Sequence, residues 1–189
     1  DWSSDVCSSD LLKRYGHLST GNYNPRTAKL YTDISQITAD TALTSDMEQV
    51  FVHLASQSKL PPLKKLLVAP FQLHHKLVEK IQAVAQGVSK GKPGRIVVKM
   101  NALTDEALVR ALVAAGQQGV KVDLITRGAC TLPAQVIGVT ENVRVRSIIG
   151  RFLEHSRVFY FREGEVEDLY LSSADWMNRN MVRRVEQIG

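Results

Sequence analysis

A histidine and an arginine, His155 and Arg157, stand two residues apart at the head of an apolar run that is typical of a strand. Alternation along a strand places both side chains on one face. A second strand-like run ends in the small, hydroxyl-rich turn Ser172–Asp175, which we expect to close over that face. Imidazole, guanidinium and turn amides around one point favour binding of a phosphoryl group. A partly buried histidine and a solvated arginine on an ordinary hairpin explain the segment equally well.

An earlier stretch repeats part of this pattern, because residues 15–24 are again a short strand that runs into a turn of small residues. Thr20-Gly21-Asn22 takes the place of Ser173-Ala174-Asp175. Two such half-sites facing each other form one active site in the phospholipase D superfamily, which the chain resembles. The first copy is incomplete, since no His-x-Lys or His-x-Arg precedes Tyr15.

More specifically, the chain resembles the bacterial polyphosphate kinases of the histidine-phosphorylating type. The matching motifs recur in the family's order across nearly all of residues 12–186. They are His17–Asn24, Thr27–Asp33, Leu66–Phe71, Lys99–Leu103, Asp123–Gly128, Gly150–Arg157 and Ser172–Asn180. The resemblance implies an α/β fold with a phospholipase D-like mixed sheet flanked by helices. It also implies one nearly complete C-terminal domain and the tail of the domain that precedes it.

This resemblance implies reversible transfer of the terminal phosphate of ATP onto inorganic polyphosphate through a phosphohistidine, with Mg²⁺ as cofactor. The implied partners are ATP, ADP and polyphosphate, and no nucleic acid. The full-length enzyme that contains this chain, the parent, is expected to be a cytoplasmic homo-oligomer, and peripheral membrane association stays open. The family's phosphohistidine belongs to the first half-site, upstream of Tyr15, and its magnesium-associated arginines also fall outside this sequence. We therefore expect the chain by itself to lack kinase activity.

The resemblance assigns His155 to the transferred phosphoryl group, as a general acid or base or as a hydrogen-bond donor. It assigns Tyr31 and Arg127, together with His155, to ATP. Arg127 follows a strand and precedes a glycine, which leaves its guanidinium free for bidentate phosphate binding. The alternatives are a surface salt bridge for Arg127 and a core aromatic for Tyr31. The candidate polyphosphate-binding residues are Lys99, Asn101, Arg151, Arg157, Ser173 and Arg179.

No metal site is predicted. The adjacent His74 and His75 lie in the first turn of an expected helix, where neighbouring side chains point about 100° apart and do not easily share one ion. Asp175 and Glu154 are expected to orient neighbouring arginine or histidine side chains, which is also a plain structural role.

Some residues differ from the sequence patterns of the two groups that the chain resembles, the polyphosphate kinases and the phospholipase D superfamily. Ser19 stands where the polyphosphate kinases usually have glycine, and their loop between Gly128 and Val139 is altered here. The phospholipase D pattern has an aspartate seven residues after its histidine, a position that Arg162 occupies in this chain. This difference argues against phosphodiesterase chemistry. A phospholipase D-like phosphodiesterase or nuclease and a noncatalytic polyanion-binding module stay as alternatives.

The two ends of the chain do not follow the family pattern. Residues 1–11 have no apolar period and resemble the translation of a sequencing adapter, as do residues 187–189. We expect residues 12–60 to be the remnant of a first phospholipase D-like domain. Residues 65–186 are expected to form the second such domain, after a linker that contains Pro61-Pro62.

Composition sets the outer bounds. A length of 189 residues with 44% hydrophobic content suits one domain, or one domain and a fragment. The net charge of +5 permits a polyanionic partner without selecting polyphosphate over nucleic acid. Cys7 and Cys130 are the only cysteines, which fits a reducing cytosol and no disulfide framework. No apolar run approaches the roughly 20 residues that span a bilayer.

Strands and helices are expected to alternate. The amphipathic pattern of residues 72–88, with apolar residues at helical spacing, predicts a helix. Further helices are predicted over 44–56 and from a Thr104 cap to Gly116 or Gly119. Strands are predicted over 66–68, 95–100, 120–126, 143–148, 157–161 and 167–171, after two short strands within 12–40. This order predicts a partly parallel sheet with helices on its faces.

Overall fold

The computed structural model describes residues 13–182 and 186–188, so the expectations for 1–11, which include Cys7, and for 189 lie outside the described residues. The described chain divides into two compact units. The first unit contains residues 13–18 and 36–66. The second contains residues 19–35 together with 67–182 and 186–188. The segment 19–35, expected to belong with the first domain, therefore packs with the second unit.

The first unit is built around α1 (Thr41–Ser56) and the pairing of β1 (Gly16–Ser19) with β3 (Ser35–Thr38). The helix begins three residues earlier than its apolar spacing predicts. The reason is the preceding Asp40, whose carboxylate accepts a hydrogen bond from the Leu43 amide at 2.8 Å and caps the first turn. Only part of the apolar side chains of α1 is buried: Met47 and Val50 are covered, whereas Phe51 and Leu54 are exposed.

The linker after α1 is anchored by a buried carboxylate. Asp46, on the first half of α1, is 1% exposed. It accepts hydrogen bonds from the backbone amides of Lys64, Lys65 and Leu66 at 2.6–3.1 Å. Three amides on one carboxylate fix where the chain leaves the first unit.

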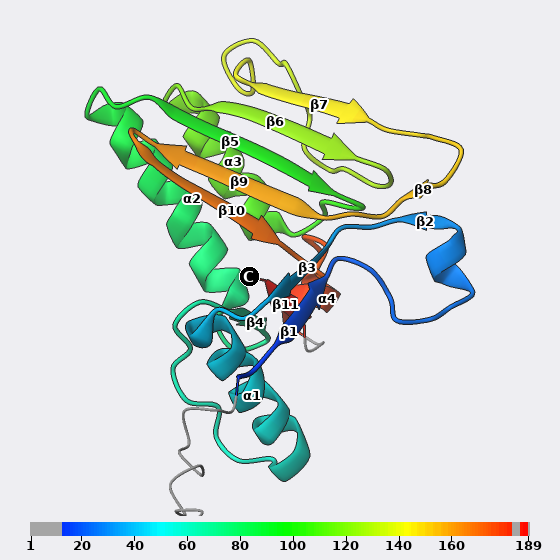
Figure 1. The fold of residues 1–189 in the computed structure, drawn as a ribbon. Coiled ribbons are helices and arrows are strands. Elements are labelled where there is room, and N and C mark those ends of the chain that lie inside the picture. The colour runs from blue at the N-terminus through cyan, green and yellow to red at the C-terminus, as the bar shows by residue number, and fades with distance from the viewer. Residues whose placement is uncertain (1–12, 183–185, 189) are drawn as a thin grey trace, which may run out of the picture. The chain divides into compact units, whose positions relative to one another are not determined.

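The second unit contains a mixed five-stranded sheet in the order β10-β9-β5-β6-β7. Its strands are β5 (Gly94–Met100), β6 (Lys121–Thr126), β7 (Val143–Ser147), β9 (Val158–Glu163) and β10 (Val166–Leu171). β5, β6 and β7 are parallel, whereas β9 and β10 run antiparallel to their neighbours. The helices α2 (Leu73–Ser89) and α3 (Glu106–Gln117) pack on one face of this sheet, behind the strands in Figure 1. The predicted α/β fold, a mixed sheet flanked by helices, is confirmed, although α2 and α3 cover one face of the sheet and not both.

Small pairings complete the second unit. β4 (Leu67–Ala69) pairs antiparallel with β11 (Glu186–Ile188), so two residues of the expected C-terminal adapter tail, 187 and 188, lie in a strand. β2 (Tyr31–Thr32) pairs in parallel with β8 (Leu153–Glu154). The remaining elements are a 3₁₀ turn at Thr27–Lys29 and the short helix α4 (Asn178–Val182).

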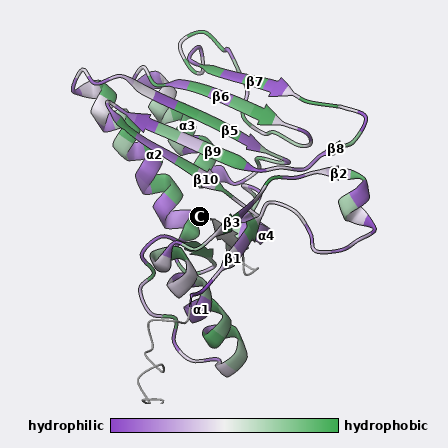
Figure 2. Cartoon of the chain, in the orientation of Figure 1, coloured by the Kyte–Doolittle hydropathy of each residue, from purple (hydrophilic) through white to green (hydrophobic). Residues whose placement is uncertain are grey.

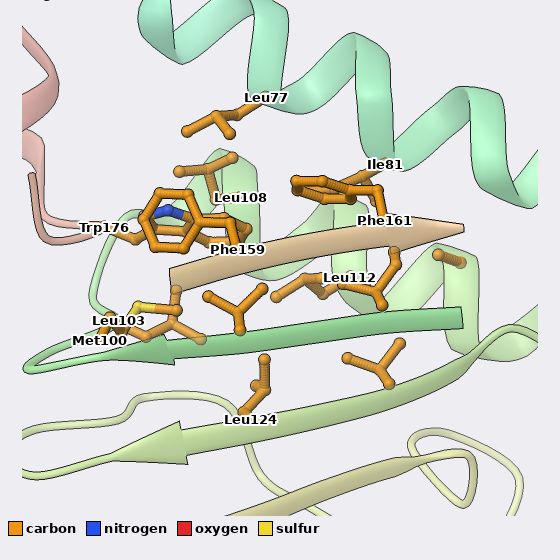
Figure 3. Close-up of a cluster of buried hydrophobic side chains, with 14 of the residues drawn as sticks. Leu77, Ile81, Met100, Leu103, Leu108, Leu112, Leu124, Phe159, Phe161 and Trp176 are labelled. Carbon is orange, nitrogen blue, oxygen red and sulfur yellow. The ribbon is translucent and has the colours of Figure 1, made fainter. Parts of the chain in front are cut away.

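The core lies between the sheet and its two helices. The strands mix hydrophilic and hydrophobic residues, in purple and green in Figure 2, and the buried ones face the helices. Figure 3 shows Leu77 and Ile81 of α2 pointing toward Phe159 and Phe161 of β9. Trp176, which follows β10, closes one end of the core and meets Phe159 edge to face at a centroid distance of 5.2 Å. The apolar stripe predicted for α2 is therefore confirmed.

The start of α3 also differs from its prediction. Asp105, not Thr104, caps α3, because its carboxylate accepts the hydrogen bond of the Leu108 amide at 3.0 Å. The amides of Thr104 and Asp105 both donate to the carbonyl of Trp176 at 2.9 Å. None of the helices in the described part of the chain combines the length and apolarity that crossing a membrane requires.

Candidate functional site

The candidate residues meet at one edge of the sheet in the second unit. Asn101 follows β5 and Arg127 follows β6, at the carboxyl ends of two parallel strands. His155 and Arg157 lie between β8 and β9, and Asp175 lies in the loop after β10. The prediction that His155 and Arg157 share one strand is wrong, because residues 155–157 form an irregular connection. They nevertheless come together, with Arg157 Nη2 3.4 Å from His155 Nε2.

Arg157 is buried rather than solvated, with 7% of its surface exposed. Its Nε and Nη2 donate to the two carboxylate oxygens of Asp175 at 2.9 and 3.1 Å, a bidentate ion pair. Its Nη1 donates to the carbonyls of Thr20 and His155 at 3.0 and 3.3 Å. Five contacts fix the guanidinium beside the imidazole, which excludes the solvated-arginine interpretation. The expectation that Asp175 orients an arginine is confirmed.

His155 is buried and held from two sides. Its Nδ1 lies 2.8 Å from Asp33 Oδ1, and the ring of Tyr31 packs against the imidazole at a centroid distance of 4.7 Å. With Nδ1 donating its proton to the carboxylate, Nε2 carries a lone pair on the side of Arg157. The arrangement lets Nε2 exchange a proton with an oxygen atom that the guanidinium also binds. Such a pairing suits a phosphate oxygen.

The turn at Thr20 and Gly21 completes this wall of the site. Thr20 Oγ1 donates to Asp33 Oδ1 at 3.0 Å, the same oxygen that faces His155. Gly21 is packed so closely that a Cβ there would lie 2.2 Å from Asp33 Oδ2, so a side chain would displace the carboxylate. Ser19, the departure from the usual glycine, accepts the Gly21 amide on its Oγ at 3.1 Å and stabilises the turn.

Asn101 links this cluster to Arg127. Its backbone amide donates to Asp175 Oδ1 at 2.8 Å, and its side-chain oxygen accepts from Arg127 Nε at 3.2 Å. The Gly128 amide donates to its carbonyl at 2.7 Å. A continuous chain of contacts therefore runs from Asp33 through His155, Arg157, Asp175 and Asn101 to Arg127.

A cleft of about 660 Å³ opens beside Arg127. Tyr31 and Arg127 line it together with residues 148–154, which include Arg151 and Phe152. Ile149 and Phe152 expose apolar surface there. Arg151 is exposed, with its guanidinium carbon 5.8 Å from the Phe152 ring centroid. The lining thus combines exposed apolar side chains with the guanidinium groups of Arg127 and Arg151.

The other predicted residues differ in their proximity. Lys99 Nζ donates to the Ser156 carbonyl at 3.0 Å and lies 3.4 Å from Glu154, so Glu154 orients a lysine and not His155. Ser173 is half-buried in the loop after β10. Arg179 is exposed on α4, which packs mainly against α2 and β4. The structure therefore brings Lys99 into contact with Glu154 and Ser156, the two neighbours of His155 in the sequence.

Burial and charge act in opposite directions on Asp175. Burial by itself raises the pKa of this carboxyl, but the hydrogen bonds and charge of Arg157, with the bonds from Asn101, outweigh it and lower the pKa. Asp175 is therefore a carboxylate at neutral pH, and the buried pair is ionic.

Comparison with known proteins identifies the family of the chain. The family model for polyphosphate kinase C-terminal domain 2 matches residues 66–189, and the model for C-terminal domain 1 matches residues 6–60. The chain belongs to the polyphosphate kinase family.

Individual polyphosphate kinases give the same result. The chain is 54% identical over 181 residues to the enzyme of Paraburkholderia phytofirmans, which covers 96% of this chain and 26% of that protein. It is 52% identical over 175 residues to the enzyme of Pseudomonas aeruginosa, covering 93% and 25%. The crystal structure of polyphosphate kinase from Porphyromonas gingivalis superposes with a TM-score of 0.87 at 36% identity, covering 92% of this chain and 27% of that one. The chain thus spans about a quarter of the length of the curated relatives it matches.

Sequence reasoning missed Asp33 as a member of the site. Asp33 lies inside one of the motifs that the chain shares with polyphosphate kinases, but 122 residues separate it from the histidine that it contacts. Only the parallel pairing of β2 with β8 brings the two segments together. An aspartate two residues after the predicted nucleotide-binding Tyr31 was the available signal.

The carboxylates of this site do not fit the magnesium that the polyphosphate kinase resemblance implies. Asp33 faces His155, Asp175 is paired with Arg157, and Glu154 lies beside Lys99. Within residues 13–182 and 186–188, no group of three or more His, Cys, Asp or Glu side chains is arranged to hold a metal ion. No step is therefore assigned to a metal here.

Proposed function

We propose that this chain forms the C-terminal part of an ATP:polyphosphate phosphotransferase, which moves the terminal phosphate of ATP reversibly onto polyphosphate. The continuous network from Asp33 to Arg127 carries the proposal. It connects a buried imidazole–guanidinium pair to a cleft that is lined by apolar and cationic side chains. Membership of the polyphosphate kinase family supports the same substrates.

In this proposal the cleft holds the nucleotide. Arg127 binds phosphate oxygens through the edge of its guanidinium that does not contact Asn101. Tyr31, Ile149 and Phe152 offer apolar surface to the rest of the nucleotide. Tyr31 lines the cleft and also packs against the imidazole of His155. A nucleotide bound in the cleft therefore directs its terminal phosphate toward His155.

His155 and Arg157 act on the phosphoryl group in flight. Arg157 stabilises negative charge on its oxygens, and its fixed position avoids reorganisation during the transfer. His155 Nε2 donates or accepts a proton at a phosphate oxygen, while Asp33 keeps the ring oriented through Nδ1. Lys99 and Arg151 extend the cationic surface toward polyphosphate. The phosphohistidine of the resembling family lies outside this sequence, so His155 is not that residue in our proposal.

The proposal also covers the location and the oligomeric state of the full-length enzyme. We place this enzyme in the cytoplasm as a homo-oligomer, and leave open whether it associates with the membrane surface. Mg²⁺ enters with ligands supplied from outside the described residues.

The test uses two proteins. The 189-residue chain, with labelled ATP, magnesium and a polyphosphate primer, is expected to give neither chain growth nor acid-labile protein phosphate. A full-length family enzyme that carries this sequence as its C-terminal part is expected to elongate polyphosphate. In that enzyme His155→Ala should lower turnover by at least roughly 100-fold, the scale of acid–base groups.

The matched control is His75→Ala, because His75 is an exposed histidine of α2 whose partner is Glu79. It should leave turnover unchanged. Near-normal turnover in the His155 variant contradicts the role of this residue. Product formation by the 189-residue chain contradicts our placement of the phosphate acceptor.

A further inference from the structure

The face of the five-stranded sheet opposite α2 and α3 carries a concentration of basic residues. The helices cover one face only (Figure 1). Strand register shows which side chains share the other face, since alternate residues point the same way. Arg95 of β5 lies opposite Arg162 of β9 and Lys121 of β6. Three cations on three adjacent strands thus form one row, which we call the basic row.

Like charges directly opposite each other on neighbouring strands destabilise a sheet. The members of the basic row each turn to a partner outside it. Arg95 pairs with Asp123 at 2.9 Å, Arg162 donates to the Gly164 carbonyl at 2.9 Å, and Lys121 contacts the Asn142 side chain. Arg162 also lies 3.8 Å from Glu167. Asp123 and, at a longer distance, Glu167 are thus the counter-ions of the basic row among the described residues.

Asp123, in the next row on the same face of the sheet, is shared by two arginines, and we call this group the clasp. Asp123 is 7% exposed and lies between Arg95 and Arg144, whose Nε donates to it at 2.7 Å. Both guanidinium groups remain about half exposed, so each keeps donors directed to solvent. Burial alone raises the pKa of Asp123, yet the hydrogen bonds and charges of both arginines lower it. The clasp therefore carries a net positive charge and holds its guanidinium groups in place.

A cleft of about 490 Å³ lies over the basic row and the clasp. Four basic side chains line it, those of Arg95, Lys121, Arg144 and Arg162, against the two carboxylates of Asp123 and Glu141. The excess of cations, several of them with free donors, suits a multivalent oxyanion. We call this cavity the basic cleft.

We propose that the basic cleft binds a linear polyphosphate chain at a second position, remote from His155. This inference rests on the proposed function, because it takes polyphosphate as the polyanion that the enzyme handles. Arg95 lies near the start of β5 and Asn101 directly follows β5, so these two residues are six positions apart, or about 20 Å along an extended strand. A long polyphosphate chain spans both places, whereas tripolyphosphate is too short to do so.

Polyphosphate is favoured over single-stranded nucleic acid by the makeup of the basic cleft. Its lining contains no aromatic side chain. Binding of single strands commonly relies on aromatic rings on which bases stack. A chain of phosphates without bases needs only repeated cations, which the basic row and the clasp supply.

The experiment measures binding of long polyphosphate to the 189-residue chain without ATP, over a series of salt concentrations. The double variant R95Q/K121Q should bind about tenfold more weakly, on the scale of one charge-assisted hydrogen bond. Its salt dependence should fall by about two counterions, one for each lost cation. Arg110→Gln is the matched control, because Arg110 is an exposed arginine on the helical face and pairs with Glu106. It should bind as the unmodified chain does.

Two further arms separate the possible explanations. The single variant Lys121→Gln should keep or raise the melting temperature, since it removes one of three adjacent like charges. It should also bind long polyphosphate more weakly than the unmodified chain does, and this loss cannot reflect misfolding. Tripolyphosphate should show a smaller loss than long polyphosphate in R95Q/K121Q, because it cannot span both positions.

Several results overturn the proposal. They are equal binding by R95Q/K121Q and the unmodified chain, an equal loss in the Arg110 control, and tighter binding of a single-stranded RNA than of polyphosphate at the same salt. Because this assay contains no ATP, failure of the phosphotransferase proposal and failure of the basic cleft give different outcomes.

Discussion

Removing the Asp175 carboxylate is expected to destabilise the second unit strongly. Asp175 accepts from Arg157 at 2.9 and 3.1 Å and from the Asn101 amide at 2.8 Å. The side chains of the ion pair are only 9% and 10% exposed. In Asp175→Ala the guanidinium stays buried without its counter-ion, a change that typically costs about 3–5 kcal/mol. Against a typical domain stability of about 5–15 kcal/mol, this is a large fraction.

Urea denaturation of the 189-residue chain, followed by far-ultraviolet circular dichroism, measures this loss. Asp175→Asn should fall between the wild type and Asp175→Ala, because it keeps the volume and one acceptor but not the charge. The control is Glu106→Ala. Glu106 is a 77% exposed partner of Arg110, for which we expect less than about 1 kcal/mol.

The pH dependence gives an independent check. The folded pKa of Asp175 is lowered, so the unfolded chain binds a proton first as pH falls. The contribution of the pair is therefore complete above the unfolded pKa of about 3.9 and disappears as pH falls through the folded value. The stability difference between wild type and Asp175→Ala should be constant near neutral pH and shrink below about pH 4. A cost below about 1 kcal/mol at neutral pH, or a difference that grows in acid, would refute this reasoning.

Three further perturbations concern the same unit. In a full-length family enzyme, Asp33→Asn should lower kcat by roughly tenfold or more with little change in the KM for ATP, because it disturbs the orientation of the imidazole. The control is Asp168→Asn, which removes a carboxylate paired with Lys80 of α2, and equal rates in both variants contradict the prediction. Arg127→Lys keeps the charge but loses the fork, so we expect a higher KM for ATP or a lower kcat with unchanged folding, and unchanged kinetics would make Arg127 structural. Trp176→Phe should change the free energy of unfolding by less than about 2 kcal/mol. The indole N–H has no hydrogen-bond partner among the described residues, so removing this N–H offsets part of the packing that is lost with the larger ring. A cost above about 3 kcal/mol, as for a typical aromatic truncation in a core, contradicts this offset.

Elements governed by local periodicity were predictable from the sequence. The apolar spacing from Leu73 to Ile81 gave α2 its buried face, and each main strand was predicted to within two residues or so at its ends. Capping was harder, because Thr104 and Asp105 both fit an N-cap and only the hydrogen bond to the Leu108 amide decides between them. Neighbouring residues thus determine an element, while its first residue depends on one contact.

The site was predictable in its members but not in its geometry. The spacing of His155 and Arg157 indicated that they act together, yet the strand that was to hold them is an irregular segment. The burial of Arg157 depends on Asp175 and on the Thr20 carbonyl, which is 137 residues away. Asp33 is equally remote from His155. Such contacts depend on which strands pair across the unit, and periodicity along the chain does not encode that pairing.

The short parallel pairing of β2 with β8 has a consequence for how sequences of this family can be exchanged. The two family models meet between residues 60 and 66, so a chimera joined there looks like a clean replacement of one module. However, Tyr31 and Asp33 lie before that junction and contact His155 after it. A recombinant with a foreign first module therefore receives a new wall for its histidine. Natural variation at Asp33 should be constrained by the residues around position 155, and successful hybrids should transfer residues 19–35 together with the second module.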